Sequence, residues 1–310
     1  MSDTWGNMLD SYEEKSWETI LTEEERMGGP SPWGNSKYSV FEQCPYKYHV
    51  AFNKRMRSTQ LSDALEIGGL FHEGKAHYYL KDVELRDTDI SDKDLDTACT
   101  KAMYDLLDRA HKVTPRITSE VRRLLTGWMK IHGPGRPTDN RHETLLIEPL
   151  LEVNRGFEYS TRLDRVILSE KLGGPVIDET KTAGRKTEDL LASYTMDGQF
   201  LGQQYCWRHS PYYKEYGPLK GFIVDLTIKT AQMSSTREVV PLNEAAMRDW
   251  EKQKRYTYKQ MVNCGLDNYW PKIRTNCVKY GPCNLRKHCG ILGRGKNAFT
   301  GFRKKKKGEY

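Results

Sequence analysis

The stretch from Gly174 to Gly184 reads GPVIDETKTAG, and it passes from an apolar run directly into charge. The apolar residues Pro-Val-Ile are followed at once by Asp178, Glu179 and Lys181. Burying charges of this kind is costly unless something compensates them. Because side chains alternate across a strand, Glu179 and Lys181 point to the same face. The stretch therefore predicts a strand whose end carries a functional group of charges.

A second carboxylate lies fourteen residues before Asp178, in the segment RLDRVI. A hairpin between two neighbouring strands would bring this residue, Asp164, beside Glu179. Two carboxylates on one face repel each other unless a cation lies between them, and oxygen ligands suit Mg²⁺ or Mn²⁺. A lysine beside that ion can orient a water molecule or help to deprotonate it, as hydrolysis of a phosphodiester requires. The alternative is a solvated salt-bridge patch, because an E-x-K triplet alone is a weak signal.

Outward from this stretch, the pattern predicts strands within residues 143–182, a helix over 189–209, two further strands, and a helix over 243–264. Upstream, SVFE reads as a capping box with Ser39 at the N-cap and Glu42 three residues later, interrupted by Pro45. A helix is predicted over 69–80, and residues 92–131 read as mainly helical. Strands in the middle with helices around them predict an α/β fold with a central mixed sheet flanked by helices.

Composition divides the 310 residues into three parts. We expect a polar extension over 1–35, one domain over 36–290 with a helical insertion at 92–131, and a basic tail over 291–310. The tail contains RKKKK at 303–307 and contributes to a net charge of +7, which favours nucleic acid as a partner, although a solvated end would look the same. No apolar run reaches the roughly 18 residues of a membrane span, and the acidic N-terminus lacks a signal-peptide core, so we expect a cytoplasmic protein.

Three of the seven cysteines form a regular group near the C-terminus, in CVKYGPCNLRKHC. Cys277, Cys283 and Cys289 are spaced C-x5-C-x5-C, whereas structural zinc sites usually contain a C-x2–4-C pair. The wide spacing favours a cubane iron–sulfur cluster, with zinc as the alternative. In a reducing compartment, disulfides are not expected.

Asp164 followed by Glu179-Thr180-Lys181 resembles the D…(D/E)-x-K core of the PD-(D/E)XK nuclease superfamily. The layout is most similar to RecB-like nucleases and their iron–sulfur relatives, among them AddB-type and CRISPR-adaptation exonucleases. Three further stretches carry the resemblance, and together the matches cover residues 36–290. They are GGLFHE, YSVFEQCPYKYHVAF and CVKYGPCNLRKHC.

The resemblance implies a restriction-endonuclease-like core and assigns roles to single residues. His72, Asp164, Glu179 and the backbone carbonyl of Thr180 would bind Mg²⁺ or Mn²⁺. Cys44 would complete a [4Fe–4S] clasp together with Cys277, Cys283 and Cys289.

The family also has a Q-x-x-x-Y motif on the next helix, and this sequence departs from it. Gln199 is followed four residues later by Gln203 instead of Tyr, and the nearest tyrosine is Tyr205. Gln199 is carried over as a catalytic residue. Tyr205, with the nearby cations Arg185 and Lys186, is expected to contact DNA.

The function expected from these residues is a metal-dependent deoxyribonuclease, an exonuclease in preference to an endonuclease, that acts on DNA ends or single strands. The alternatives are a non-catalytic DNA-binding or assembly subunit with the same fold, and a sequence-specific endonuclease. The chain contains no G-x-x-x-x-G-K-[ST] motif of a helicase. A protein partner in a repair, phage or CRISPR pathway is left open.

Overall fold

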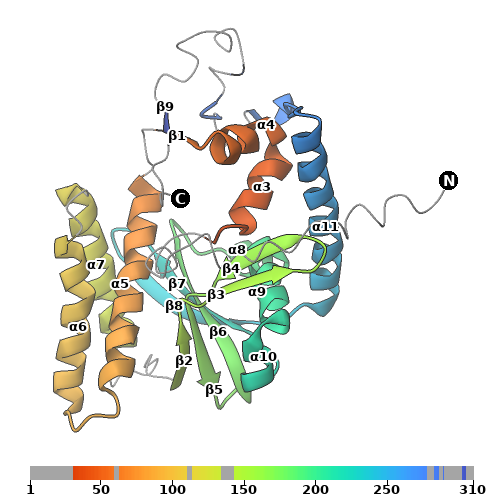
Figure 1. Ribbon diagram of the computed structural model, residues 1–310. Coiled ribbons are helices and arrows are strands. Elements are labelled where there is room, and N and C mark those ends of the chain that lie inside the picture. Colours follow the sequence, from red (N-terminus) through yellow and green to blue (C-terminus); the bar gives the residue numbers. More distant parts are fainter. Residues whose placement is uncertain are drawn as a thin grey trace. The chain divides into compact units, whose positions relative to one another are not determined.

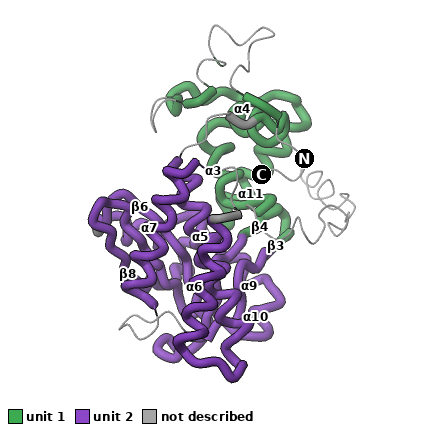
Figure 2. Tube along the Cα trace, turned by 90° about the vertical axis from the view of Figure 1, so that its left-hand side faces the viewer, with its two compact units in different colours: residues 1–57, 152–161, 251–310 green, residues 58–151, 162–250 purple. Residues whose placement is uncertain are grey.

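The computed structural model describes residues 31–58, 63–109, 114–133, 143–277, 283–285, 289 and 302–304. The chain forms two compact units, coloured in Figure 2. Unit 1 comprises residues 1–57, 152–161 and 251–310, and unit 2 comprises residues 58–151 and 162–250. Most of the expected polar extension and of the basic tail lies outside the described residues.

Unit 2 is built on a five-stranded sheet that is mixed, as predicted. Its central pair, β6 and β7, is parallel, and the other neighbouring strands are antiparallel. The parallel pairing places Glu179 opposite Val224 and Lys181 opposite Leu226. The strands, in their order across the sheet, are β2 (Glu143–Ile147), β5 (Arg165–Ser169), β6 (Gly174–Ala183), β7 (Phe222–Ile228) and β8 (Ser234–Val240).

Three helices form a layer beside this sheet in Figure 1: α5 (Asp63–Leu85), α6 (Asp92–Arg109) and α7 (Pro115–His132). They share an apolar core in which Phe71, Met103 and Trp128 have no exposed surface. The mainly helical reading of residues 92–131 is confirmed by α6 and α7. Helix α5 extends beyond the predicted range at both ends, and past Leu80 the buried side chain of Asp82 forms an ion pair with Arg86.

The helix predicted over 189–209 is broken into pieces. They are α8 (Glu188–Ser193), a 3₁₀ turn (Tyr194–Met196) and α9 (Gly198–His209), and α10 (Pro211–Tyr216) follows. The break occurs because Asp197 leaves the helical conformation and caps α9, accepting a hydrogen bond from the backbone N–H of Gln199 at 2.7 Å. A new helix therefore begins just where the candidate residue Gln199 stands.

Unit 1 is formed from the two ends of the chain and a short hairpin. Its helical elements are α3 (Asn35–Gln43), α4 (Pro45–Tyr48), a π-helical turn (His49–Asn53), most of α11 (Glu244–Leu266) and a 3₁₀ turn (Arg274–Cys277). Its strands are β9 (Phe302–Lys304) and most of β1 (Met56–Ser58), β3 (Leu150–Asn154) and β4 (Glu158–Arg162). Strand β1 pairs with β9, and β3 pairs with β4.

The capping box predicted at Ser39 is wrong, because α3 begins at Asn35. Glu42 does not turn back onto the start of a helix. Its Oε1 accepts hydrogen bonds from Lys254 Nζ at 2.6 Å and from Thr257 Oγ1 at 3.1 Å, both on α11. The predicted interruption at Pro45 is confirmed, since α3 ends before it and Cys44 is fully extended.

Within the described part of the chain, no helix is long and apolar enough to cross a membrane.

Candidate active site

The two predicted carboxylates lie side by side at one end of the β5–β6 pair. Arg165, the first residue of β5, is opposite Asp178 in the antiparallel register, so Asp164 comes level with Glu179 just before β5 begins. At that point β6 has no neighbour on this side, and the backbone N–H of Thr180 would lack a ladder partner. The Oδ2 atom of Asp164 accepts this N–H at 2.7 Å. The late start of strand β5 therefore places the carboxylate of Asp164 at the edge of β6, level with Glu179.

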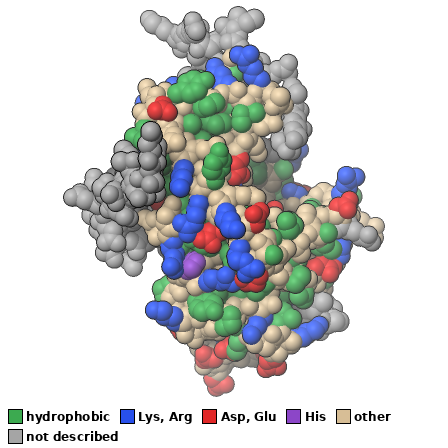
Figure 3. All heavy atoms as spheres, turned by 90° about the vertical axis from the view of Figure 1, so that its right-hand side faces the viewer, with side chains coloured by type: hydrophobic (Ala, Val, Ile, Leu, Met, Phe, Trp, Pro, Cys, Tyr) green, Lys and Arg blue, Asp and Glu red, His purple; other side chains and the backbone are tan. Residues whose placement is uncertain are grey.

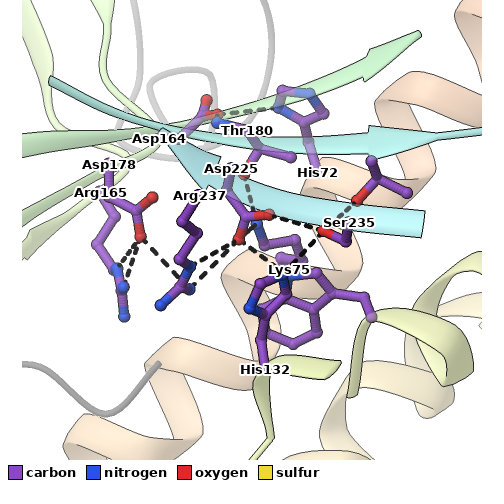
Figure 4. Close-up of polar contacts among 12 residues, drawn as sticks. His72, Lys75, His132, Asp164, Arg165, Asp178, Thr180, Asp225, Ser235 and Arg237 are labelled. Atoms are coloured by element: carbon purple, nitrogen blue, oxygen red, sulfur yellow. Dashed lines mark hydrogen bonds and ion pairs between the residues drawn. The ribbon is translucent and has the colours of Figure 1, made fainter. Parts of the chain in front are cut away.

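His72 approaches the same carboxylate from helix α5. Its Nδ1 atom lies 3.1 Å from Asp164 Oδ2 (Figure 4). Burial lowers the pKa of His72, but the charges of Asp164 and Glu179 outweigh burial, and the pKa is raised. The histidine predicted from GGLFHE thus contacts Asp164, and the charge of Glu179 also acts on it.

Glu179 is almost fully buried and is held by three donors. Its Oε1 accepts from Lys181 Nζ at 2.8 Å and from Gln199 Nε2 at 2.6 Å, while its Oε2 accepts from Gln203 Nε2 at 2.7 Å. Lys181 Nζ also donates to Gln199 Oε1 at 2.7 Å. Strand β6 and helix α9 therefore form one hydrogen-bonded group, with α9 on the face of β6 that carries Glu179 and Lys181.

The electrostatics of this group follow from two acids and two bases in a small buried space. Burial and then the charge of Asp164 raise the pKa of Glu179. Burial lowers the pKa of Lys181, but Glu179 and Asp164 outweigh it and the pKa is raised, so the lysine is a cation here. Burial raises the pKa of Asp164, but His72 and Lys181 outweigh burial and lower it, so Asp164 remains ionised.

These residues provide the donors that a hard divalent ion needs. His72 and Asp164 are in contact. Glu179 is close enough to Asp164 for the charge of Asp164 to raise the pKa of Glu179. One imidazole and two carboxylates suit Mg²⁺ or Mn²⁺. Among the described residues, no three His, Cys, Asp or Glu side chains converge into a ready-made ion site. Both oxygens of Glu179 are engaged with donors from Lys181 and the two glutamines, so these contacts would have to adjust for an ion to bind.

The structure separates the residues expected to contact DNA. Tyr205 is 1% exposed and packs against His209 and Trp250, so its ring is not available to stack on a base. Arg185 is exposed just after β6. Lys186 is also exposed, and it forms an ion pair with Glu238 at 2.6 Å.

Gln203 is the site residue that the sequence did not assign. It occupies the place of the tyrosine in the Q-x-x-x-Y motif, one helical turn after Gln199, and it is completely buried against Glu179. The four-residue spacing of the two glutamines on one helix face was the signal that could have identified it.

A buried ionic network lies on the opposite face of the strands, under helix α5 (Figure 4). Lys75 Nζ donates to Thr180 Oγ1 and to Asp225 Oδ2, both at 2.8 Å. Asp225 also accepts from Trp128 Nε1 at 2.9 Å and forms an ion pair with Arg237 at 3.3 Å. No sequence pattern singled out this network, because its members come from five separate segments of the chain.

The same network includes a second buried ion pair at the start of β5. Arg165 contacts Asp178 at 2.5 Å and lies 3.6 Å from the ring centre of Tyr79. Asp178, the first acid of the GPVIDETKTAG stretch, is thus part of the buried network and lies on the face of the sheet opposite Glu179.

The cysteines predicted to act together lie in unit 1. Burial raises the pKa of the Cys289 thiol, and the neighbouring thiols of Cys283, Cys44 and Cys277 raise it further. The segment before Cys277 lies against α4, since the Pro271 carbonyl accepts the backbone N–H of Tyr46 at 3.1 Å. The four thiols therefore share one neighbourhood, although in the described residues they do not form a closed metal site.

The remaining three cysteines are divided between the two units. Cys99 and Cys206 are buried in unit 2, and Cys264 is near the end of α11. Burial and the charge of Asp267 raise the pKa of Cys264.

Comparison with known proteins places this arrangement in a family. A sequence model of the PD-(D/E)XK nuclease superfamily matches residues 32–290. A solved protein from Eubacterium rectale, described as "Putative exonuclease", is 11% identical, with 89% of this chain and 95% of that chain covered and a TM-score of 0.53. At this identity the likeness concerns the fold alone. A protein solved as SSO0001 is 16% identical over 60% of this chain and 82% of that chain, with a TM-score of 0.28. No curated protein matches the chain.

Proposed function

This chain belongs to the PD-(D/E)XK nuclease superfamily, and we propose that it is a metal-dependent deoxyribonuclease that hydrolyses phosphodiester bonds at DNA ends or in single strands. The observation that carries the proposal is the contact of Glu179 with Lys181 at 2.8 Å beside Asp164, which in turn contacts His72. A solvated salt-bridge patch does not account for this group, because Glu179 is 1% exposed and is held by amides as well as by the lysine.

Each residue has a distinct task in this proposal. His72, Asp164, Glu179 and the Thr180 carbonyl would hold Mg²⁺ or Mn²⁺. Once bound, such an ion polarises the phosphate and lowers the pKa of a water molecule. Lys181, held as a cation between Glu179 and Gln199, is positioned to orient the attacking water and to offset negative charge that develops on the phosphate. Gln199 fixes the lysine by accepting a hydrogen bond from its ammonium group.

DNA as the substrate is supported by charge. Lys and Arg side chains gather on the face drawn in Figure 3, and the chain has a net charge of +7. Positive side chains bind the phosphate backbone regardless of sequence and give a binding constant that falls with salt. Arg185, exposed directly after the active-site strand, is the residue that we assign to this contact.

Glu179→Ala and Lys181→Ala test the chemistry. Each should abolish cleavage of linear DNA in Mg²⁺ or Mn²⁺ while DNA binding and folding are retained. Parallel assays on circular and on single-stranded DNA distinguish an exonuclease, which spares closed circles, from an endonuclease. Wild-type cleavage rates in both variants would show that the active site lies elsewhere, and an inactive wild-type protein that binds DNA would favour the non-catalytic subunit.

We further propose that Cys44, Cys277, Cys283 and Cys289 bind a [4Fe–4S] cluster. Support comes from an all-thiol donor set and from the electrostatic effect of the other three thiols on Cys289. Such a cluster would join residues more than 230 positions apart in the chain, and its role would be structural. Zinc is the alternative ion for the same four thiols.

A further inference from the structure

Thr180, the middle residue of Glu179-Thr180-Lys181, is contacted from two directions. Its backbone N–H donates to Asp164 Oδ2 at 2.7 Å, on the side of the candidate active site. Its side-chain Oγ1 accepts from Lys75 Nζ at 2.8 Å, within the buried network on the other face. Side chains alternate between the two faces of β6, so Glu179 and Lys181 face the candidate active site while the hydroxyl of Thr180 faces the buried network.

Lys75 is held firmly where it contacts the threonine. Its side chain is 2% exposed, and its second partner, Asp225, is completely buried. Asp225 is in turn fixed by Trp128 and Arg237. A lysine ammonium has three donors, so Thr180 and Asp225 together satisfy two of them in a buried space. Lys75 therefore acts as a rigid support behind the strand.

Lys75 also belongs to the helix that carries a candidate metal ligand. It lies three residues after His72 on α5, and residues three apart share one face of a helix. His72 reaches Asp164 and Lys75 reaches Thr180, so the two residues attach α5 at adjacent points. Both attachments lead to Asp164, one directly and one through the backbone of Thr180.

We propose that Thr180, supported by Lys75, is a positioning residue that fixes the carboxylate of Asp164 for binding of the divalent ion. This inference rests on the proposed function. A buried ion pair such as Lys75–Asp225 is weak evidence for stability by itself, but it can hold elements in one register. Here the register held is that of α5 against β6, the two elements that carry His72, Glu179 and Lys181.

The test is binding of Mn²⁺ to the full-length protein without DNA, followed by the electron paramagnetic resonance signal of the free ion. Thr180→Val keeps the shape and the backbone N–H but removes the hydroxyl acceptor. It should raise the dissociation constant for Mn²⁺ by about tenfold or more, the usual effect of losing a partner behind a metal ligand. Thr180→Ser restores the acceptor and should bind Mn²⁺ like the wild type.

Thr227→Val is the matched control. Thr227 is a completely buried threonine on β7 whose Oγ1 lies 3.1 Å from Ser235 Oγ. Ser235 in turn donates to Asp225 at 3.3 Å, so this variant disturbs the same network without removing the contact between Lys75 and Thr180. Both valine variants should show a similar fall in thermal stability, but only Thr180→Val should show a fall in affinity for Mn²⁺. Loss of binding in Glu179→Ala assigns the signal to this site.

Two outcomes separate the inference from its premise. Wild-type protein that binds Mn²⁺, with unchanged affinity in Thr180→Val, would overturn the positioning role and leave the proposed nuclease intact. Equal loss of affinity in Thr180→Val and Thr227→Val would also overturn it, because the effect would then be a general loosening of the sheet. Wild-type protein that binds no Mn²⁺ would overturn the proposed metal site, and this inference with it.

Discussion

At the scale of single residues, the site shows how an altered motif can keep its contacts. A glutamine stands at the position where the related motif has tyrosine, and the Gln203 amide donates to Glu179 Oε2 at 2.7 Å. Glu179 Oε1 is already engaged by Lys181 and Gln199. The second amide thus satisfies an oxygen that would otherwise be buried without a donor, which costs about 1–3 kcal/mol or more for a charged group.

Gln203→Leu should therefore impair the site while the fold is retained. Leucine matches the volume but cannot donate to Glu179, and loss of a partner behind a metal ligand typically lowers affinity or activity by about 10–100-fold. Gln204→Leu is the matched control, since the Gln204 amide points away and donates to Glu244 at 2.6 Å. Steady-state cleavage of linear DNA checks the prediction, which fails if both variants cut equally well.

Residues of the site differ in how far sequence could predict them. His72, Asp164, Glu179 and Lys181 could be expected to lie together, the acids and the lysine from strand alternation and hairpin spacing and the histidine from its motif. Tyr205 was expected to contact DNA, but its side chain is buried: two residues after Gln203 on a helix, a side chain is turned by about 200° and faces the core.

The supporting role of Thr180 had no local signal at all. Its partner Lys75 is 105 residues away in sequence, and the charged Asp225 behind it reads simply as part of an apolar strand. Contacts of this kind depend on which strands become neighbours, and no local pattern encodes that.

At the scale of elements, tertiary contacts decided several boundaries. Ser39 and Glu42 have the spacing of a capping box, but Glu42 pairs with Lys254, which is 6% exposed. Because α3 begins at Asn35, Ser39 lies inside the helix and cannot act as its N-cap. The strands of the five-stranded sheet fall within the stretches predicted as strands, although β3 and β4 from the same stretches form a separate hairpin. The helix predicted over 189–209 is broken because one aspartate, Asp197, caps a new helix there.

The network between α5 and the sheet predicts a dependence of stability on pH. Burial raises the pKa of Asp225, but Lys75 and Arg237 outweigh burial, and the pKa lies well below its usual range. An acid with a lowered pKa stabilises the fold above its unfolded pKa of about 3.9, and this contribution is lost as pH falls toward the folded value. The wild-type protein should therefore lose stability below about pH 5.

Asp225→Asn should remove this contribution. At pH 7 it should lower the free energy of unfolding by about 3–5 kcal/mol, because Lys75 and Arg237 are left buried without their counter-charge. The decline between pH 5 and pH 3 should also become shallower than in the wild type. Urea unfolding over this range measures both effects. Asp105→Asn is the control, since Asp105 forms an exposed pair with Lys101 and should change little; equal behaviour of the two variants would contradict the prediction.

At the scale of the whole molecule, charge and cysteine chemistry extend beyond the active site. The basic tail runs on from β9, and only residues 302–304 of it are described. Replacing Lys305, Lys306 and Lys307 by glutamine leaves β9 unaltered. If these lysines bind DNA phosphates, the slope of log binding constant against log salt should fall by about 0.7–0.9 for each phosphate that is no longer neutralised. Cleavage at saturating DNA should persist, and an unchanged slope would identify the tail as a solvated end.

The four thiols of unit 1 give the last prediction. Protein purified without oxygen should be brown and contain about four irons per chain, as a cubane cluster requires. Cys44→Ser should lose iron and unfold more readily, because binding of a metal centre contributes directly to folding. The same is expected of the other three ligands, since a cluster that lacks one thiolate is open to solvent.

Cys206→Ser is the control, because Cys206 is buried in unit 2 and has no place in the proposed ligand set. It should keep colour and iron content. If the folded protein is colourless and contains one zinc per chain, the four thiols bind zinc and not an iron–sulfur cluster. If Cys44→Ser retains its iron, Cys44 is not a ligand. Because the thiols belong to unit 1 and Glu179 and Lys181 to unit 2, Glu179→Ala should remain brown while it loses cleavage, which separates the role of the cluster from the chemistry.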